Sequence, residues 1–127
     1  IPNLTNTTNA RHMFSGATSL GLGTGNWNWD VSTLTDISVM FGYTNNFNKD
    51  ISSWDTSNVV TMENTFTFSG FNNNINTWDV SSVTDMYAMF ATARNFNQPL
   101  NNWDTSSVTN FGYMFYEAVS FNQPNGS

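Results

Sequence analysis

The chain has 127 residues, a formal net charge of −6, only three lysine or arginine residues and no cysteine. So few cations cannot neutralise a run of phosphates, which argues against nucleic acid and anionic membrane surfaces as partners. The missing cysteines exclude a disulfide framework, and no apolar run approaches the roughly 18 residues of a membrane span. Aromatic residues make up 16% of the chain and indicate a packed core.

Residues 1–28 are predicted to form a divergent N-terminal repeat. Met13 and Phe14 match a Met-Phe pair of the later repeats, but Thr7 is polar where the later repeats carry an aliphatic residue. A terminal repeat lacks one neighbour and often departs from the pattern, so this one is predicted to act as a cap. Because the chain begins without methionine and stops within a repeat, we expect a processed product or an excised fragment.

Residues 29–127 repeat one unit of 24–25 residues that begins with tryptophan, at Trp29, Trp54, Trp78 and Trp103. Numbered from the tryptophan as zero, Asp follows at +1, Ser at +3, an aliphatic residue at +5, Phe at +12 and Phe-Asn at +18 and +19. The second unit lacks one residue between Phe66 and Phe71, so that its Asn72 is equivalent to the asparagines at +19. A period of this length is typical of a solenoid whose windings bury their apolar faces against one another. The sequence therefore predicts a single repeat domain of about five coils.

Each unit has two halves with different local signals. Apolar residues at +5, +8, +11 and +12 have helical spacing, and Ser82 to Asp85 has the S-x-x-D pattern of a helix start. These features predict a short helix or helical turn from about +7 to +15. The other half, residues 97–103, is short and extended, and its Pro99 suits the first residue of a strand or a turn, which predicts one short strand.

The unit W-D-x-S-x-V-T-x-M-x-x-M-F-x-x-A-x-x-F-N-x-x-I/L resembles the 25/26-residue bacterial surface protein repeat of mycoplasma and listerial surface lipoproteins. The match is strong over residues 29–124 and weak over 1–28, with departures at Thr65 and Phe111. The resemblance implies a leucine-rich-repeat-like solenoid with one short strand plus a short helix or helical turn per coil. It also implies display at the cell surface and adhesion or interaction, and it implies neither catalysis nor a residue-level site.

Three columns of equivalent residues carry the structural predictions. The asparagines at +19 are predicted to form a ladder that bonds adjacent coils, with ligand binding as the alternative; they are Asn48, Asn72, Asn97 and Asn122. The aspartates at +1 are predicted to cap their own turns, with a calcium site as the alternative; they are Asp30, Asp55, Asp79 and Asp104. The phenylalanines at +12 are predicted to fill the core; they are Phe41, Phe66, Phe90 and Phe115.

The tryptophan column has two interpretations. It alternates with phenylalanine and methionine at core offsets, which favours stacking in or near the core. If the rings pointed outward, they would instead form a platform on which a sugar could stack.

The residues needed for catalysis are missing. His12 is the only histidine, Glu63 and Glu117 are alone in their repeats, and a triad or a zinc site cannot be assembled. We therefore predict that the chain is not an enzyme and binds no cofactor or metal.

The sequence leads to one functional hypothesis and two rivals. The first is an extracellular, cell-surface module for adhesion that binds a host or matrix protein or a glycan, without inserting into a membrane. The second is a structural role, in which the chain associates with itself through the solenoid ends as the stalk or subunit of a surface filament. The third is ice binding, which is weaker because Thr and Asn occur at several offsets without one TxT column.

Overall fold

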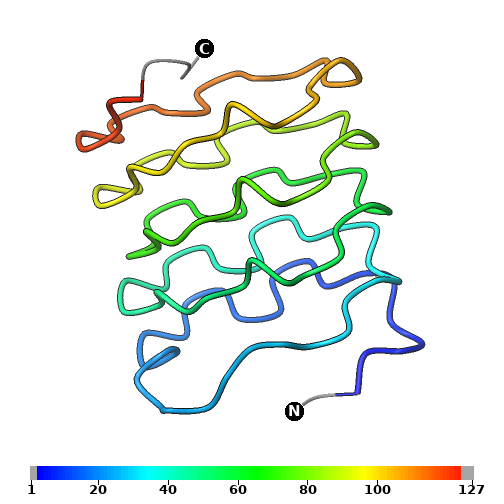
Figure 1. Cartoon of the computed structure of the whole chain (residues 1–127). Helices are drawn as coiled ribbons and strands as arrows, with labels where there is room; N and C mark the ends of the chain where they lie inside the picture. Colours follow the sequence, from blue (N-terminus) through cyan, green and yellow to red (C-terminus); the bar gives the residue numbers. More distant parts are fainter. Residues whose placement is uncertain (1–2, 124–127) are drawn as a thin grey trace.

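The computed structural model describes residues 3–123, which wind around five times. The windings comprise residues 3–28, 29–53, 54–77, 78–102 and 103–123, and they lie on one another in sequence order from the N-terminal to the C-terminal end (Figure 1). One residue of each winding forms an isolated parallel bridge to the next, which sets the register; the bridges are Asn9↔Asp36, Asp36↔Thr61, Thr61↔Asp85 and Asp85↔Asn110. Equivalent residues of the repeat are therefore stacked one winding apart.

The predicted leucine-rich-repeat-like solenoid, with a strand and a helix in each coil, is wrong. Between residues 3 and 123 there is no helix, and the only β-structure is the single-residue bridges. The described chain is a compact domain that is mostly coil. Residues 1–2 of the predicted first repeat and residues 124–127 of the predicted last repeat lie outside the described residues.

Consecutive turns replace the predicted helix. In the second winding Met40 N–H donates to the Ile37 carbonyl at 3.1 Å, and Gly42 N–H donates to the Val39 carbonyl at 3.0 Å. Val39 has a φ of 57° and Tyr43 a φ of 61°, whereas an α-helix needs a negative φ at every residue. The same arrangement recurs in every winding, and we call these stretches the turn segments: residues 10–17, 37–44, 62–69, 86–93 and 111–118.

Turns form in place of a helix because the neighbouring windings offer hydrogen bonds that a helix could not use. An α-helix directs its N–H groups to the carbonyl four residues back along the same chain. In the turn segments alternate N–H groups instead leave the winding, and Val39 N–H donates to the Glu63 carbonyl at 2.9 Å. Successive turns bring every third or fourth side chain to the core, so they produce the apolar spacing that predicted a helix.

The predicted strand does not form, for a related reason. In residues 97–103 the Asn97 N–H donates to a side-chain oxygen, Oδ1 of Asn72, at 2.9 Å. The Asn102 N–H donates in the same way to Oδ1 of Asn76 at 3.0 Å. Because side chains accept these backbone donors, no backbone ladder forms in this half of the winding.

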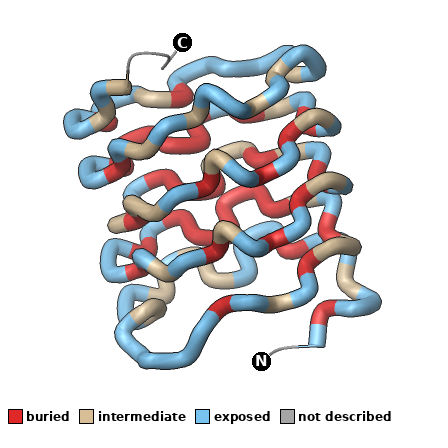
Figure 2. The backbone as a smooth tube through the Cα atoms, in the orientation of Figure 1, coloured by how far each residue is buried: buried red, intermediate tan, exposed pale blue. Residues whose placement is uncertain are grey.

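Two stacks of phenylalanine rings run through the molecule from winding to winding. Phe41, Phe66 and Phe90 are 0% exposed, and their ring centroids are 5.7 Å and 5.6 Å apart with nearly parallel planes. The second stack consists of Phe47, Phe71, Phe96 and Phe121. The buried residues lie along the inside of the windings, and the exposed ones lie on their outer bends (Figure 2).

Candidate binding surface

The asparagine column lies between windings and accepts backbone hydrogen bonds. Asn72 N–H donates to Asn48 Oδ1 at 2.7 Å, Asn97 N–H to Asn72 Oδ1 at 2.9 Å, and Asn122 N–H to Asn97 Oδ1 at 3.0 Å. The amide of Gln98 also donates to Asn72 Oδ1, at 3.0 Å. Within residues 3–123 the oxygens of Asn48, Asn72 and Asn97 are thus used inside the protein, which leaves them little capacity for a ligand.

Each aspartate at +1 bonds to its own turn. Asp79 Oδ1 accepts the N–H of Ser81 at 2.9 Å and the hydroxyl of Ser81 at 2.6 Å. The hydroxyl, followed by the N–H, holds the pKa of the Asp79 carboxyl below its ordinary value, while slight burial and the neighbouring Asp104 raise it by less. The same serine contacts lower the pKa of the other three aspartates in the column, Asp30, Asp55 and Asp104. Across residues 3–123 no group of three or more His, Cys, Asp or Glu side chains gathers where it could hold a metal ion.

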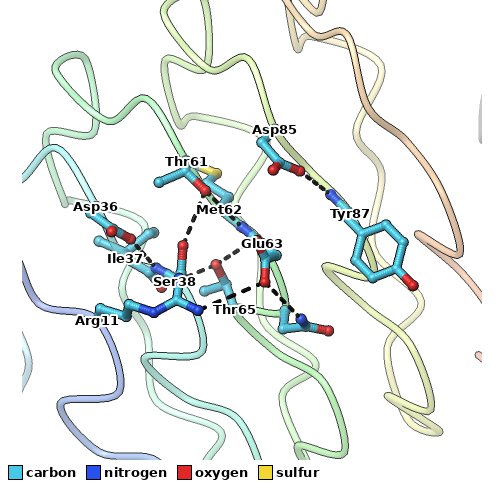
Figure 3. Close-up of polar contacts among 11 residues, drawn as sticks. Arg11, Asp36, Ile37, Ser38, Thr61, Met62, Glu63, Thr65, Asp85 and Tyr87 are labelled. Atoms are coloured by element: carbon cyan, nitrogen blue, oxygen red, sulfur yellow. Dashed lines mark hydrogen bonds and ion pairs between the residues drawn. The ribbon is translucent and has the colours of Figure 1, made fainter.

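A further polar column, at +7, was not predicted as a site. Its members are the bridge residues, and their side chains accept the N–H two residues later: Asp36 Oδ1 from Ser38 at 2.9 Å and Asp85 Oδ1 from Tyr87 at 2.9 Å (Figure 3). Asp85 belongs to the S-x-x-D pattern of the sequence analysis, which in the structure caps a turn and not a helix. The sequence signal that could have identified this column is the polar residue at +7 in every unit.

Beside this column, one ion pair spans two windings. Arg11 of the first winding lies 3.9 Å from a carboxylate oxygen of Glu63 in the third (Figure 3). Both side chains are at least one-third exposed, so the solvent screens the pair and its contribution to stability is small.

The two central tryptophans of the column, Trp54 and Trp78, do not form a platform for a ligand. Trp54 and Trp78 are 3% and 2% exposed. Their indole N–H groups donate to backbone carbonyls of Trp27 at 2.6 Å and Ile51 at 3.0 Å. Since both the ring faces and the polar edge of these residues are occupied, the alternative of an outward sugar-binding column does not apply to them.

Exposed aromatic residues instead lie on the turn segments, where the sequence analysis had placed no site. Tyr43 and Phe68 are each 51% exposed, and their rings stack at 5.3 Å and 12°. Tyr113 is 62% exposed and makes edge contacts with Tyr87 at 5.8 Å and Tyr116 at 5.5 Å. We call these the Tyr43–Phe68 pair and the Tyr113 cluster.

The backbone of three of these aromatic residues is strained. Tyr43, Phe68 and Tyr113 have φ values of 61°, 54° and 55°, a region in which a bulky residue is unfavourable. At the position equivalent to Tyr43 and Phe68, the first winding has Gly16 and the fifth has Glu117. The winding therefore needs the conformation but does not need an aromatic side chain there.

Comparison with known proteins points to one family. A family model described as "Mycoplasma protein of unknown function, DUF285" matches residues 67–127. Neither the curated proteins nor the solved structures yield a match to the chain. The C-terminal part of the chain is thus similar to a mycoplasma family, in agreement with the coarser part of the predicted resemblance. In addition, no helix of a length and apolar character suited to crossing a membrane occurs in the described part.

Proposed function

We propose that the chain is a non-enzymatic repeat module of a cell surface that binds a protein or glycan partner through its exposed aromatic side chains. The observation that carries this proposal is the Tyr43–Phe68 pair, two half-exposed rings that stack on the outside of the turn segments. Surface placement and adhesion are supported by the resemblance of the repeat unit to bacterial surface repeats.

Aromatic rings held at a surface are suited to recognition. They offer a large apolar contact area at a low cost in conformational entropy, and tyrosine adds a hydroxyl for hydrogen bonding. The apolar face of a sugar ring or a side chain of a protein partner can pack on them. Stacking of Tyr43 on Phe68 fixes both rings before a partner arrives, which reduces the ordering cost of binding.

The low charge of the chain supports a partner recognised by packing and neutral hydrogen bonds. Only 9% of the residues are charged, and the aspartates at +1 are already bonded to their own turns. The asparagines of the column between the windings also form hydrogen bonds within the protein. A site on the turn segments leaves all of these contacts intact.

The test uses the strain of the two positions. Asn tolerates a positive φ better than Tyr or Phe does, so the double variant Tyr43→Asn/Phe68→Asn should fold with unchanged or higher thermal stability. It should lose binding, by at least about tenfold in Kd, to a partner found by screening the parent chain against arrays of glycans and matrix proteins. Val60→Ala removes an exposed aliphatic residue outside the turn segments and is the matched control.

Two results would contradict the proposal. One is a partner whose affinity is the same for the parent, the double variant and Val60→Ala. The other is a hydrolytic activity of the parent chain that the double variant retains.

A further inference from the structure

Gly16 is in register with the Tyr43–Phe68 pair, one winding before it. The residues at this position of the turn segments, from the first winding to the fifth, are Gly16, Tyr43, Phe68, Thr92 and Glu117. Gly16 N–H donates to the Gly42 carbonyl at 2.9 Å, and Tyr43 N–H donates to the Thr67 carbonyl at 2.8 Å in the same way. The first winding therefore has no side chain where the second and third carry the stacked rings.

The ring of Tyr43 has one covered face and one open face. One face stacks on Phe68 in the third winding, with 5.3 Å between the ring centroids and 12° between the planes. The other face is turned toward the first winding, and Tyr43 is still 51% exposed. A Cβ built on Gly16 would have no described atom within 4 Å, so the space beside this face is open. We call the space between Gly16 and the open face of Tyr43 the Tyr43 notch.

The notch is defined by two neighbouring windings and not by an end of the stack. Its two boundaries, the Gly16 backbone and the Tyr43 ring, lie on adjacent described windings, and the missing side chain of Gly16 makes the space between them. In the fourth winding the same position holds Thr92, which is 6% exposed. In the fifth it holds Glu117, whose carboxylate lies 3.5 Å from Arg94. Within residues 3–123, the first winding is thus the only one without a side chain at this position.

The surroundings of the notch are polar but uncharged. Residues 13–29 and 37–48, which flank it in the two windings, contain no Asp, Glu, Lys or Arg. Thr18 and Asn45 lie two residues along each winding from the notch, and both are exposed. No hydrogen bond within residues 3–123 uses their side chains or the Tyr43 hydroxyl. An apolar ring face beside free neutral donors and acceptors suits a ligand that is itself neutral, polar at its edge and apolar on one face.

We propose that the Tyr43 notch binds one neutral pyranose unit of a glycan. The apolar face of the sugar packs on the open face of Tyr43, in the space that a side chain at Gly16 would take, and its hydroxyl groups bond to the neutral groups nearby. A protein partner fits less well, because such an interface needs about 800 Å² on each side and is enriched in arginine, whereas the notch has room for one ring. The inference rests on the proposed function, since it uses the Tyr43–Phe68 pair, and it names the chemistry of the partner.

The test fills the notch without changing the aromatic pair. Gly16→Asn places a side chain over the open face of Tyr43, and asparagine tolerates the φ of 78° found at Gly16. Gly16→Thr is a second way to fill the notch, because Thr92 already occupies this position in the fourth winding with a φ of 56°. Gly23→Asn is the matched control, since a Cβ at Gly23 also meets no atom within 4 Å and this residue lies outside the turn segments. Circular dichroism checks that all three variants fold as the parent does.

The probes are neutral hexasaccharides of glucose, mannose, galactose and N-acetylglucosamine, titrated at millimolar concentration into the isotope-labelled chain and followed by NMR. The parent should bind at least one of them, with the largest shift changes at the Gly16 amide and the Tyr43 ring. Gly16→Asn and Gly16→Thr should weaken that binding at least about tenfold, and Gly23→Asn by less than about twofold. Because the surroundings of the notch are uncharged, the affinity should be the same at low and at high NaCl concentration.

The outcomes separate this inference from the proposed function. If the parent binds none of the hexasaccharides, the notch is not a sugar site, and the proposed function stands only if another partner requires the Tyr43–Phe68 pair. If a hexasaccharide binds the parent and the folded Gly16 variants equally, the inference also fails; loss of that binding in Tyr43→Asn/Phe68→Asn would then keep the aromatic site and move the sugar elsewhere on it. Binding that neither the Gly16 variants nor the double variant weakens would contradict both.

Discussion

Within residues 3–123 the third and fourth windings have a neighbouring winding on each side, whereas the first and fifth have one. Phe66 and Phe90, in windings with a neighbour on each side, are 0% exposed. Phe14 and Phe115 occupy the same offset in the end windings and are only partly buried. Identical side chains in nearly identical backbone turns thus differ because of what lies above and below them. The stability of each winding comes mainly from its neighbours, as expected where the repeat has no helix or sheet of its own.

The largest loss of stability is expected when a phenylalanine ring is removed from the core. Phe90→Ala should lower the free energy of unfolding by about 3–5 kcal/mol, because Phe66, Phe96 and Phe115 all pack on that ring and would border a cavity. Phe14→Ala should cost about 1–2 kcal/mol, since that ring is already partly exposed. Chemical denaturation measures both. Equal losses would show that neighbouring windings do not set the cost.

The next test concerns the approach of backbone to backbone. A Cβ added at Gly70 would lie 2.2 Å from the carbonyl oxygen of Asn45, in the unit that is one residue shorter than the others. Gly70→Ala should therefore cost about 1–3 kcal/mol, as the third winding is pushed away from the second. Gly23→Ala, in the first winding, meets open space and should be neutral or slightly stabilising. Thermal melts of the two variants give the contrast, and a neutral Gly70→Ala would mean that the windings separate easily.

A smaller difference is expected in the asparagine column. Asn72→Ala removes the acceptor of the Asn97 N–H and leaves the Gln98 amide only its longer bond to the Asn72 carbonyl at 3.3 Å, so it should cost about 1–2 kcal/mol. Asn122→Ala removes an oxygen that accepts no bond within residues 3–123, and its own N–H bond to Asn97 is kept. It should cost less than about 0.5 kcal/mol. Hydrogen exchange at the Asn97 amide should rise only in the first variant; a similar rise in both would rule out side-chain acceptance there.

The aspartate turns should show no difference between central and end windings. Ser57→Ala and Ser106→Ala each remove the hydroxyl that contributes most to the lowered pKa of the preceding aspartate, Asp55 or Asp104. Each substitution should raise that pKa toward its ordinary value by a similar amount, because the contact lies within one turn. Carboxylate titration by NMR measures both shifts, and a shift confined to the central winding would contradict a local origin.

The sign of the accompanying pH dependence follows from linkage. A carboxyl group whose pKa is lower in the folded state stabilises the fold above its unfolded pKa, and this contribution is lost as the pH falls through the folded pKa. The parent chain should therefore lose some stability below about pH 4. The two serine variants should show a weaker dependence in that range, because their aspartates have less of a shift to lose.

Much of the side-chain arrangement could be predicted from the repeat alone. A period of 24–25 residues predicts that equivalent residues lie one winding apart, and residues that occupy the same offset in every unit are then in contact whatever the backbone does. The asparagines at +19 lie between windings and Phe41, Phe66 and Phe90 lie in the core for that reason. The Tyr43–Phe68 pair was missed because only two of the five windings carry an aromatic residue at that offset, although Gly16 and Glu117 at the same position indicate an exposed site.

The backbone conformation could not be predicted in the same way. Apolar residues at +8, +11 and +12 fit a helix and a run of turns equally well, and no local signal distinguishes the two. The choice depends on alternate N–H groups such as those of Val39 and Phe41, which find the carbonyls of Glu63 and Thr65 about one period away in the sequence.

The sequence by itself determined the repeat length, the residues that meet between windings and the low charge that argues against nucleic acid. Only the tertiary structure decided that the windings are built from turns, and that Trp54 and Trp78 are buried with their indole N–H groups bonded to backbone carbonyls. The physical reason is that a backbone N–H group has no identity in the sequence. Its direction is set by the nearest available carbonyl, and in this chain that carbonyl often belongs to the next winding.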